Sequence, residues 1–253
     1  MPFRLATLAV LALSLAMPSR ARAQERAFGP GEAVAYSCSY LGVRVGTIQV
    51  VVGSPTPVMG RSVWPIMGVG RTESFFLVYP VHDRYVAWWD PKERIPVGTD
   101  MQANENHRTR RERVRFHRGK NQATTTREKE GKKESVDYEV HPGALDVLSA
   151  LYAIRTRPLN VGDHEELPVF TGKKSFTMKV DVDRKEPVET KVGRFEAKVL
   201  KVQVGFSGKL ASKREMMVHV TDDPRHLFLR LDAEFLLGSL VAELVEYEKG
   251  VSP

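Results

Sequence analysis

The side chains that could support catalysis or metal binding are scattered along this sequence. Its seven histidines form neither an H-E-x-x-H motif nor a close pair on a helical face, the spacings typical of protein zinc sites. Ser149 lacks the G-x-S-x-G pattern that exposes a nucleophilic serine. Asp222 and Asp223 are adjacent but precede Pro224, and this composition is typical of a tight turn. We therefore predict no catalytic residue, no metal site and no cofactor, and a protein that is not an enzyme.

Arg155 is the charged residue with the most unusual surroundings. The segment from Ala144 to Arg155 has helical periodicity, and Arg155 falls in the middle of its apolar half, which includes Leu148, Leu151 and Tyr152. We expect that half to pack on a concave apolar surface, while the small residues of the other half permit close approach of a sheet. A guanidinium in such an arc needs a carboxylate, carbonyl groups or an anionic ligand. Two roles stay open: a structural ion pair, or a ligand site in which Arg155 holds an anionic head group and an apolar chain lies among Leu148, Leu151 and Tyr152.

A second cluster of positive charge lies on one face of a predicted strand, at Arg111, Arg113 and Arg115. Such a stripe suits contact with an anionic surface, such as a phosphate-rich glycolipid or an acidic partner. The alternative is a solvated strand face that opposes aggregation. Aromatic residues do not alternate with these arginines, as they do in single-stranded nucleic-acid sites, so we predict no nucleic-acid partner.

The first 23 residues have the composition of a cleavable secretory leader. Arg4 precedes an apolar run, and Ala21-Arg22-Ala23 is an A-x-A cleavage site. No cysteine follows that site, so we predict that the mature chain is not a lipoprotein. Three of the seven net positive charges lie in the leader, which leaves the mature chain at +4. We predict export to the periplasm of a Gram-negative bacterium or beyond it, with no transmembrane anchor, because no second long apolar run occurs.

The mature chain, residues 24–253, reads as a single domain made almost entirely of strands. About a dozen short alternating or apolar runs are separated by turns rich in Gly, Pro and Asp. We predict an all-β fold, a large antiparallel sheet that curls or closes into a barrel-like shape, with one short helix packed against or into it. Cys38 is the only cysteine, which rules out an intramolecular disulfide, and we expect a buried thiol there. Trp88 and Trp89 should face opposite sides of their strand.

Several short motifs in this order resemble an exported bacterial family, "domain of unknown function 3108". They are Phe28-x-Pro30-Gly31-Glu32, Tyr40-x-Gly42 with Gly46, Asp146-x-Leu148-Ser149-x-Leu151-Tyr152-x-x-Arg155, Val192-Gly193-x-Phe195 and Thr221-Asp222-Asp223. The resemblance implies a secreted or periplasmic, mostly β, barrel-like domain with the Leu-Tyr-Arg helix packed into it, and it implies no activity. The chain departs from the pattern at Val218-His219-Val220, where we expect a tryptophan before the Thr-Asp-Asp turn.

The functional hypothesis from the sequence is a non-enzymatic exported β domain. We expect it to bind an apolar or amphipathic molecule of the cell envelope, a lipid for example, or an envelope protein. An envelope-acting hydrolase and an interaction scaffold without a ligand cavity are the alternatives. The sequence leaves the oligomeric state open.

Overall fold

The computed structural model describes residues 27–72, 82–105, 108–204, 215–235 and 238–251, so the predicted leader lies outside the described residues. The described helical segments are α1 (Val147–Ile154) and a short 3-10 turn at Arg118–Lys120. The strands are β1 (Ala33–Tyr40), β2 (Val43–Val52), β3 (Thr56–Val58), β4 (Arg61–Thr72), β5 (His82–Asp90), β6 (Ile95–Glu105), β7 (Arg108–His117), β8 (Gln122–Lys129), β9 (Lys132–Glu139), β10 (His164–Phe170), β11 (Ser175–Thr190), β12 (Gly193–Gln203), β13 (Met216–Thr221), β14 (Phe228–Phe235) and β15 (Gly238–Glu248).

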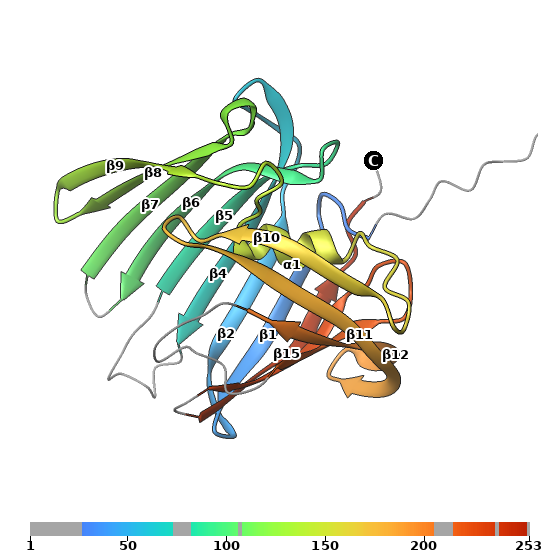
Figure 1. Cartoon of the computed structure of the whole chain (residues 1–253). Coiled ribbons are helices and arrows are strands. Elements are labelled where there is room, and N and C mark those ends of the chain that lie inside the picture. The colour runs from blue at the N-terminus through green and yellow to red at the C-terminus, as the bar shows by residue number, and fades with distance from the viewer. Residues whose placement is uncertain (1–26, 73–81, 106–107, 205–214, 236–237, 252–253) are drawn as a thin grey trace, which may run out of the picture.

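These strands form one large antiparallel sheet that curls around the helix (Figure 1). The order is β10-β11-β12-β13-β14-β15-β1-β2-β4-β5-β6-β7-β8-β9, with the short β3 paired to β4. Most neighbours in the sheet are also neighbours in the chain, and the β1–β15 pair joins the first strand to the last. The two edges, β9 and β10, are therefore consecutive strands, and α1 lies in the connection between them. The predicted all-β, curled, barrel-like fold with one helix is confirmed.

Two-residue turns shape several of the hairpins. Leu41 and Gly42 both have positive φ, at 50° and 79°, and Glu130 and Gly131 have 52° and 76°. Positive φ at both central residues is the geometry of the hairpin turn whose twist matches that of paired strands. Glycine at the second position adopts it without steric penalty. These two turns connect β1 to β2 and β8 to β9.

The helix is shorter than the sequence predicts, and its burial is shared between small residues and two large apolar ones. It begins after Asp146, whose carboxylate accepts a hydrogen bond from the Ser149 backbone N–H at 3.0 Å. Of the residues before it that were predicted as helical, Leu145 instead pairs with Val169 of β10. Ser149, Ala150 and Ala153 are buried, together with the larger Tyr152 and Ile154. Val147 is 39% exposed and Leu148 and Leu151 are only partly buried, so part of the aliphatic face is left without full packing.

Side chains, rather than a ladder of backbone hydrogen bonds, link the two edges of the sheet. The Phe170 ring of β10 packs against Phe116 of β7 and Tyr138 of β9, with centroid distances of 6.3 and 5.4 Å. The Arg127 guanidinium of β8 donates to the Gly172 carbonyl, in the β10–β11 turn, at 2.6 Å. The curl is thereby held in a nearly closed shape.

Arg118 fastens the segment that leads into the helix. Its guanidinium donates to the carbonyls of Pro96, Pro142 and Ala144 at 2.7–2.9 Å and lies over the Phe116 ring. Burial lowers the pKa of Arg118 to about 10, so the side chain is still charged at neutral pH. In the part of the chain that is described, no helix has the length and apolar character needed to span a membrane.

Candidate functional site

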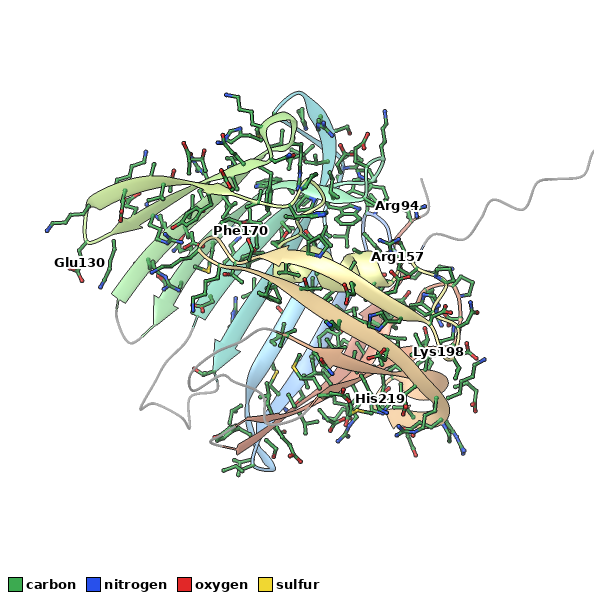
Figure 2. The ribbon with its side chains drawn as sticks, in the orientation of Figure 1. Arg94, Glu130, Arg157, Phe170, Lys198 and His219 are labelled. Carbon is green, nitrogen blue, oxygen red and sulfur yellow. The ribbon has the colours of Figure 1, made fainter. Side chains whose placement is uncertain are left out.

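The clearest hollow beside the helix lies between α1, the inner face of β6–β8 and the β10–β11 turn. It has a volume of about 580 Å³, within the range of small-molecule binding sites. Leu148 and Leu151 of α1 form one wall, and Val114, Phe116 and Phe170 form the opposite wall. Figure 2 marks Phe170 at this place, on the strand that crosses in front of the helix. The incompletely packed leucines of α1 are therefore exposed to this cavity.

One end of the cavity carries a buried hydrogen-bonded group centred on Asp146. The Ser149 hydroxyl donates to Asp146 Oδ2 at 2.5 Å, and the Tyr85 hydroxyl also hydrogen-bonds this carboxyl group. Burial raises the pKa of Asp146, although the hydrogen bonds from Ser149 and Tyr85 oppose the shift. Burial, reinforced by the Asp146 charge, also raises the pKa of Tyr85. This group fixes the start of α1 and the position of the cavity wall.

The other end of the cavity is charged. Glu112 and Arg127 form an ion pair, with Arg127 Nε 2.7 Å from Glu112 Oε2, and both line the cavity. Arg110 and Lys173 also line it and are exposed. The cavity therefore combines apolar walls with two exposed cations at its mouth.

Arg155 is fully occupied by protein groups. Its guanidinium makes a bidentate ion pair with Glu32 at 2.7 and 2.9 Å, and the two side chains are 1% and 2% exposed. It also donates to the carbonyls of Ala27 and Arg225 at 2.8 and 3.1 Å. Glu32 raises the pKa of Arg155 against the effect of burial, which lowers it. Of the two roles left open by the sequence, this geometry matches the structural ion pair.

Tyr152 is packed in the core rather than facing the Leu148–Leu151 cavity. Its ring meets the Phe28 ring edge to face, with a centroid distance of 4.7 Å, and the Arg155 guanidinium lies 5.0 Å from the Tyr152 centroid. Of the four predicted ligand-binding residues, the structure places Leu148 and Leu151 in one cavity, whereas Tyr152 is buried in the core and Arg155 does not line that cavity.

The arginine stripe lies on the outer face of β7 and is largely paired. Arg113 and Arg115 both contact the Asp100 carboxylate, at 2.7 and 3.0 Å. Arg111 lies 3.9 Å from Glu128. Contact of these arginines with an anionic surface stays a prediction, although Asp100 already offsets part of their charge.

The other chemically interesting residues serve local structure. Asp222 pairs with Lys185 and Lys198 in the β13–β14 turn, as expected for a turn carboxylate. Cys38 is buried, and burial raises the pKa of its thiol, which suppresses the reactive thiolate. Trp89 is 1% exposed, whereas Trp88 is partly exposed and donates to Asp100. Within the described ranges, no three His, Cys, Asp or Glu side chains are grouped closely enough to hold a metal ion.

Sequence reasoning missed three residues that organise this region. Glu32, the partner of Arg155, stands in the first quoted motif, but nothing in the spacing pairs two residues so far apart. Asp146 lies two residues inside the segment predicted as helical, which begins at Ala144, so the apolar pattern alone does not mark it as the helix cap. Tyr85 gave no signal, because only the curl of the sheet brings β5 to the start of α1.

Fold and site together define a curled antiparallel β domain with a hollow beside its single described helix. The chain matches the family model described as "Protein of unknown function (DUF3108)" over residues 35–245, and it belongs to that family. No curated protein matches the sequence at a significant level.

Solved structures with similar folds include a "beta-barrel-like protein of domain of unknown function DUF1849" from Brucella abortus. It has a TM-score of 0.62 and 7% identity, covering 90% of this chain and 100% of that one. A "putative lipoprotein" from Parabacteroides distasonis has a TM-score of 0.33 and 11% identity, covering 88% and 98% of the two chains. The first likeness supports the barrel-like fold.

Proposed function

We propose that this protein is an exported, non-enzymatic β domain that binds an amphipathic molecule of the cell envelope in the cavity beside α1. The observation that carries the proposal is the orientation of α1. Its small residues pack into the core together with Tyr152 and Ile154, while Leu148 and Leu151 line a cavity of about 580 Å³. Because Leu148 and Leu151 are only partly buried, they lack part of the roughly 1.5–3 kcal/mol that full burial of each side chain provides, and an apolar ligand would restore some of it.

The distribution of charge favours a ligand with an anionic end. Arg110 and Lys173 are the exposed cations of the lining, while its carboxylates are internally engaged and its remaining wall is largely leucine, valine and phenylalanine. A molecule with an acyl chain and a carboxylate or phosphate head group matches both parts. Its chain would lie along the leucines, and its head group would stay at the mouth, where the cations remain hydrated.

The polar groups of the cavity support binding rather than hydrolysis. Asp146 is occupied as the cap of α1, and Glu112 is paired with Arg127. Acid–base catalysis needs a titratable group free to reach the reacting atom. Neither carboxyl group is free in this way, so a hydrolase is the weaker alternative.

Export through the leader would place the cavity among envelope lipids. A chain beginning at Gln24 would retain every residue described in the sheet and in the cavity. A periplasmic location agrees with an amphipathic ligand, because an extracytoplasmic domain meets such molecules at membrane surfaces.

The test is to purify the protein gently from its native envelope and to identify bound lipid by mass spectrometry. Binding of 11-dansylaminoundecanoic acid, a fluorescent fatty acid, then provides a titration. Leu148→Trp and Leu151→Trp should fill the cavity and weaken this binding by about tenfold or more, a loss of about 1.4 kcal/mol.

The matched control is Val192→Trp, which places the same side chain on an exposed turn. It should bind the probe like the parent protein. Absence of co-purifying lipid together with absence of saturable probe binding would reject the ligand proposal and favour a scaffold. Equal binding by all three variants would place the ligand elsewhere.

A further inference from the structure

A second hollow lies at the opposite end of α1 and shares no lining residue with the first. Its volume is about 600 Å³, and it is formed where the end of the helix meets the β5–β6 and β13–β14 turns. Arg94 and Arg157 stand at its rim, and Figure 2 shows both at this corner of the molecule. We call it the Arg94–Arg157 cup.

The lining of the cup carries positive charge and no carboxylate among the described residues. Arg155 contributes little net charge to the cup, because it forms a buried ion pair with Glu32. Arg94 is exposed and makes no ion pair within the described ranges. Arg157 lies 3.7 Å from Glu165, and both side chains are partly exposed, so this contact is weak and open to competition.

The walls of the cup are rigid. Pro91, Pro158 and Pro224 each come from a different turn, and proline fixes one backbone angle. The turn that presents Arg94 is held by the buried Asp90, whose carboxylate accepts the Lys92 and Glu93 backbone N–H groups. A rigid rim reduces the entropy lost when a ligand is bound.

The floor of the cup is apolar and fixed. Phe28 packs edge to face on Trp64, with a centroid distance of 6.0 Å, and lies 5.9 Å from Trp89. The polar groups of the remaining lining are largely satisfied internally. Thr156 donates to the Ala153 carbonyl, and His226 Nδ1 lies 3.0 Å from the Arg155 carbonyl oxygen. The rim arginines are therefore the groups left to bind a charged ligand.

From this arrangement we infer that the cup binds an anionic sugar, a ring bearing a phosphate or carboxylate group. Two guanidinium groups suit a phosphate or carboxylate, with which they form charge-assisted hydrogen bonds. A sugar ring presents C–H faces toward the apolar floor and hydroxyl groups toward the polar rim. The volume also exceeds what a bare phosphate would fill.

The experiment is calorimetric titration of the purified protein with glucose 6-phosphate, glucuronate, glucose and inorganic phosphate. We expect saturable binding of the two anionic sugars, with glucose and phosphate weaker by about tenfold or more, because each lacks one half of the recognition. Arg94→Glu combined with Arg157→Glu should abolish the binding, and the milder Arg94→Gln with Arg157→Gln should reduce it.

The matched control is Lys129→Glu with Lys132→Glu. It makes the same change in net charge at the β8–β9 turn, whose Glu130 lies at the far side of the molecule in Figure 2. It should bind like the parent protein. All four arginine substitutions are on exposed side chains, and an unchanged circular dichroism melting curve would confirm folding.

Three results would overturn the inference. They are the absence of saturable binding of either anionic sugar, phosphate binding as tight as that of glucose 6-phosphate, or unchanged binding in the Arg94→Glu/Arg157→Glu variant. None of these results would count against ligand binding in the cavity beside Leu148 and Leu151, because the two hollows have no lining residue in common.

Discussion

The ion pair between Glu32 and Arg155 should be the most sensitive single contact in this fold. Glu32 directly precedes β1 and Arg155 directly follows α1, and Arg155 also donates to Ala27 and to Arg225 in the β13–β14 turn. One side chain therefore joins the first strand, the helix and a distant turn. Both partners are almost fully buried, so water cannot replace a missing partner.

Removal of either charge alone should be severely destabilising. Breaking a buried ion pair by deleting one partner costs about 3–5 kcal/mol, because the other charge is left without compensation. Typical domains unfold with a free energy of about 5–15 kcal/mol, so Glu32→Leu or Arg155→Met should remove a large part of the stability. Urea unfolding followed by tryptophan fluorescence measures the change in unfolding free energy, provided that the slope of that free energy against urea concentration is the same for each variant.

The double variant separates a charge effect from a packing effect. Glu32→Leu combined with Arg155→Met leaves no buried charge, so it should cost less than the sum of the single variants by about 2 kcal/mol or more. The exposed Arg157–Glu165 pair is the control, and Arg157→Met should change stability by about 1 kcal/mol or less. Additive effects, or a loss below about 1 kcal/mol for Glu32→Leu, would refute this account of the pair.

The remaining predictions concern the closure of the sheet and the response to pH. Gly172→Ala should lower the free energy of unfolding in urea by about 1–3 kcal/mol, because φ is 80° and the added Cβ would clash with Glu112. Gly131→Ala is the control. Gly131 has a similar φ but open space around the added Cβ, so this substitution should cost less. Arg118→Met should cost about 2 kcal/mol or more in the same assay, because three carbonyls lose their donor. Burial lowers the folded-state pKa of His226, so the unfolded chain binds more protons and stability falls as pH drops below about 6.5. His226→Gln should therefore reduce the loss of unfolding free energy measured between roughly pH 7 and pH 5. An unchanged pH dependence would contradict this expectation. His164 should affect the pH dependence of stability with the opposite sign. The hydrogen bond to Asp181 raises the folded-state pKa of His164, so its contribution to stability is present at low pH and is lost as pH rises.

Much of the architecture was readable along the chain because it depends on local rules. Alternation and turn composition predicted the strands and their antiparallel arrangement, and the Leu41-Gly42 and Glu130-Gly131 turns of the structure follow the same local rules. The opposite facing of Trp88 and Trp89 follows from strand geometry alone. The family resemblance carried by the short motifs is likewise confirmed by the family match.

The candidate site was less predictable because its residues come from distant strands. Leu148 and Leu151 line the cavity beside α1, but periodicity could not show that they are less buried than Tyr152 and Ile154 of the same apolar half. Tyr85 and Phe170 reach the cavity only because the curl of the sheet brings β5 and β10 to the helix. Turn composition likewise does not reveal that Arg94 and Arg157 stand at one rim.

Sequence alone determined the strand-rich class, the position of the helix and the need of Arg155 for a partner. These follow from the period of apolar residues and from the energetic penalty of a buried charge, which are properties of short segments. The tertiary structure decided which partner meets Arg155, which helical face is buried and where the two hollows lie. Each of those depends on how far the sheet curls, and that curl arises from contacts between residues that are remote in the chain.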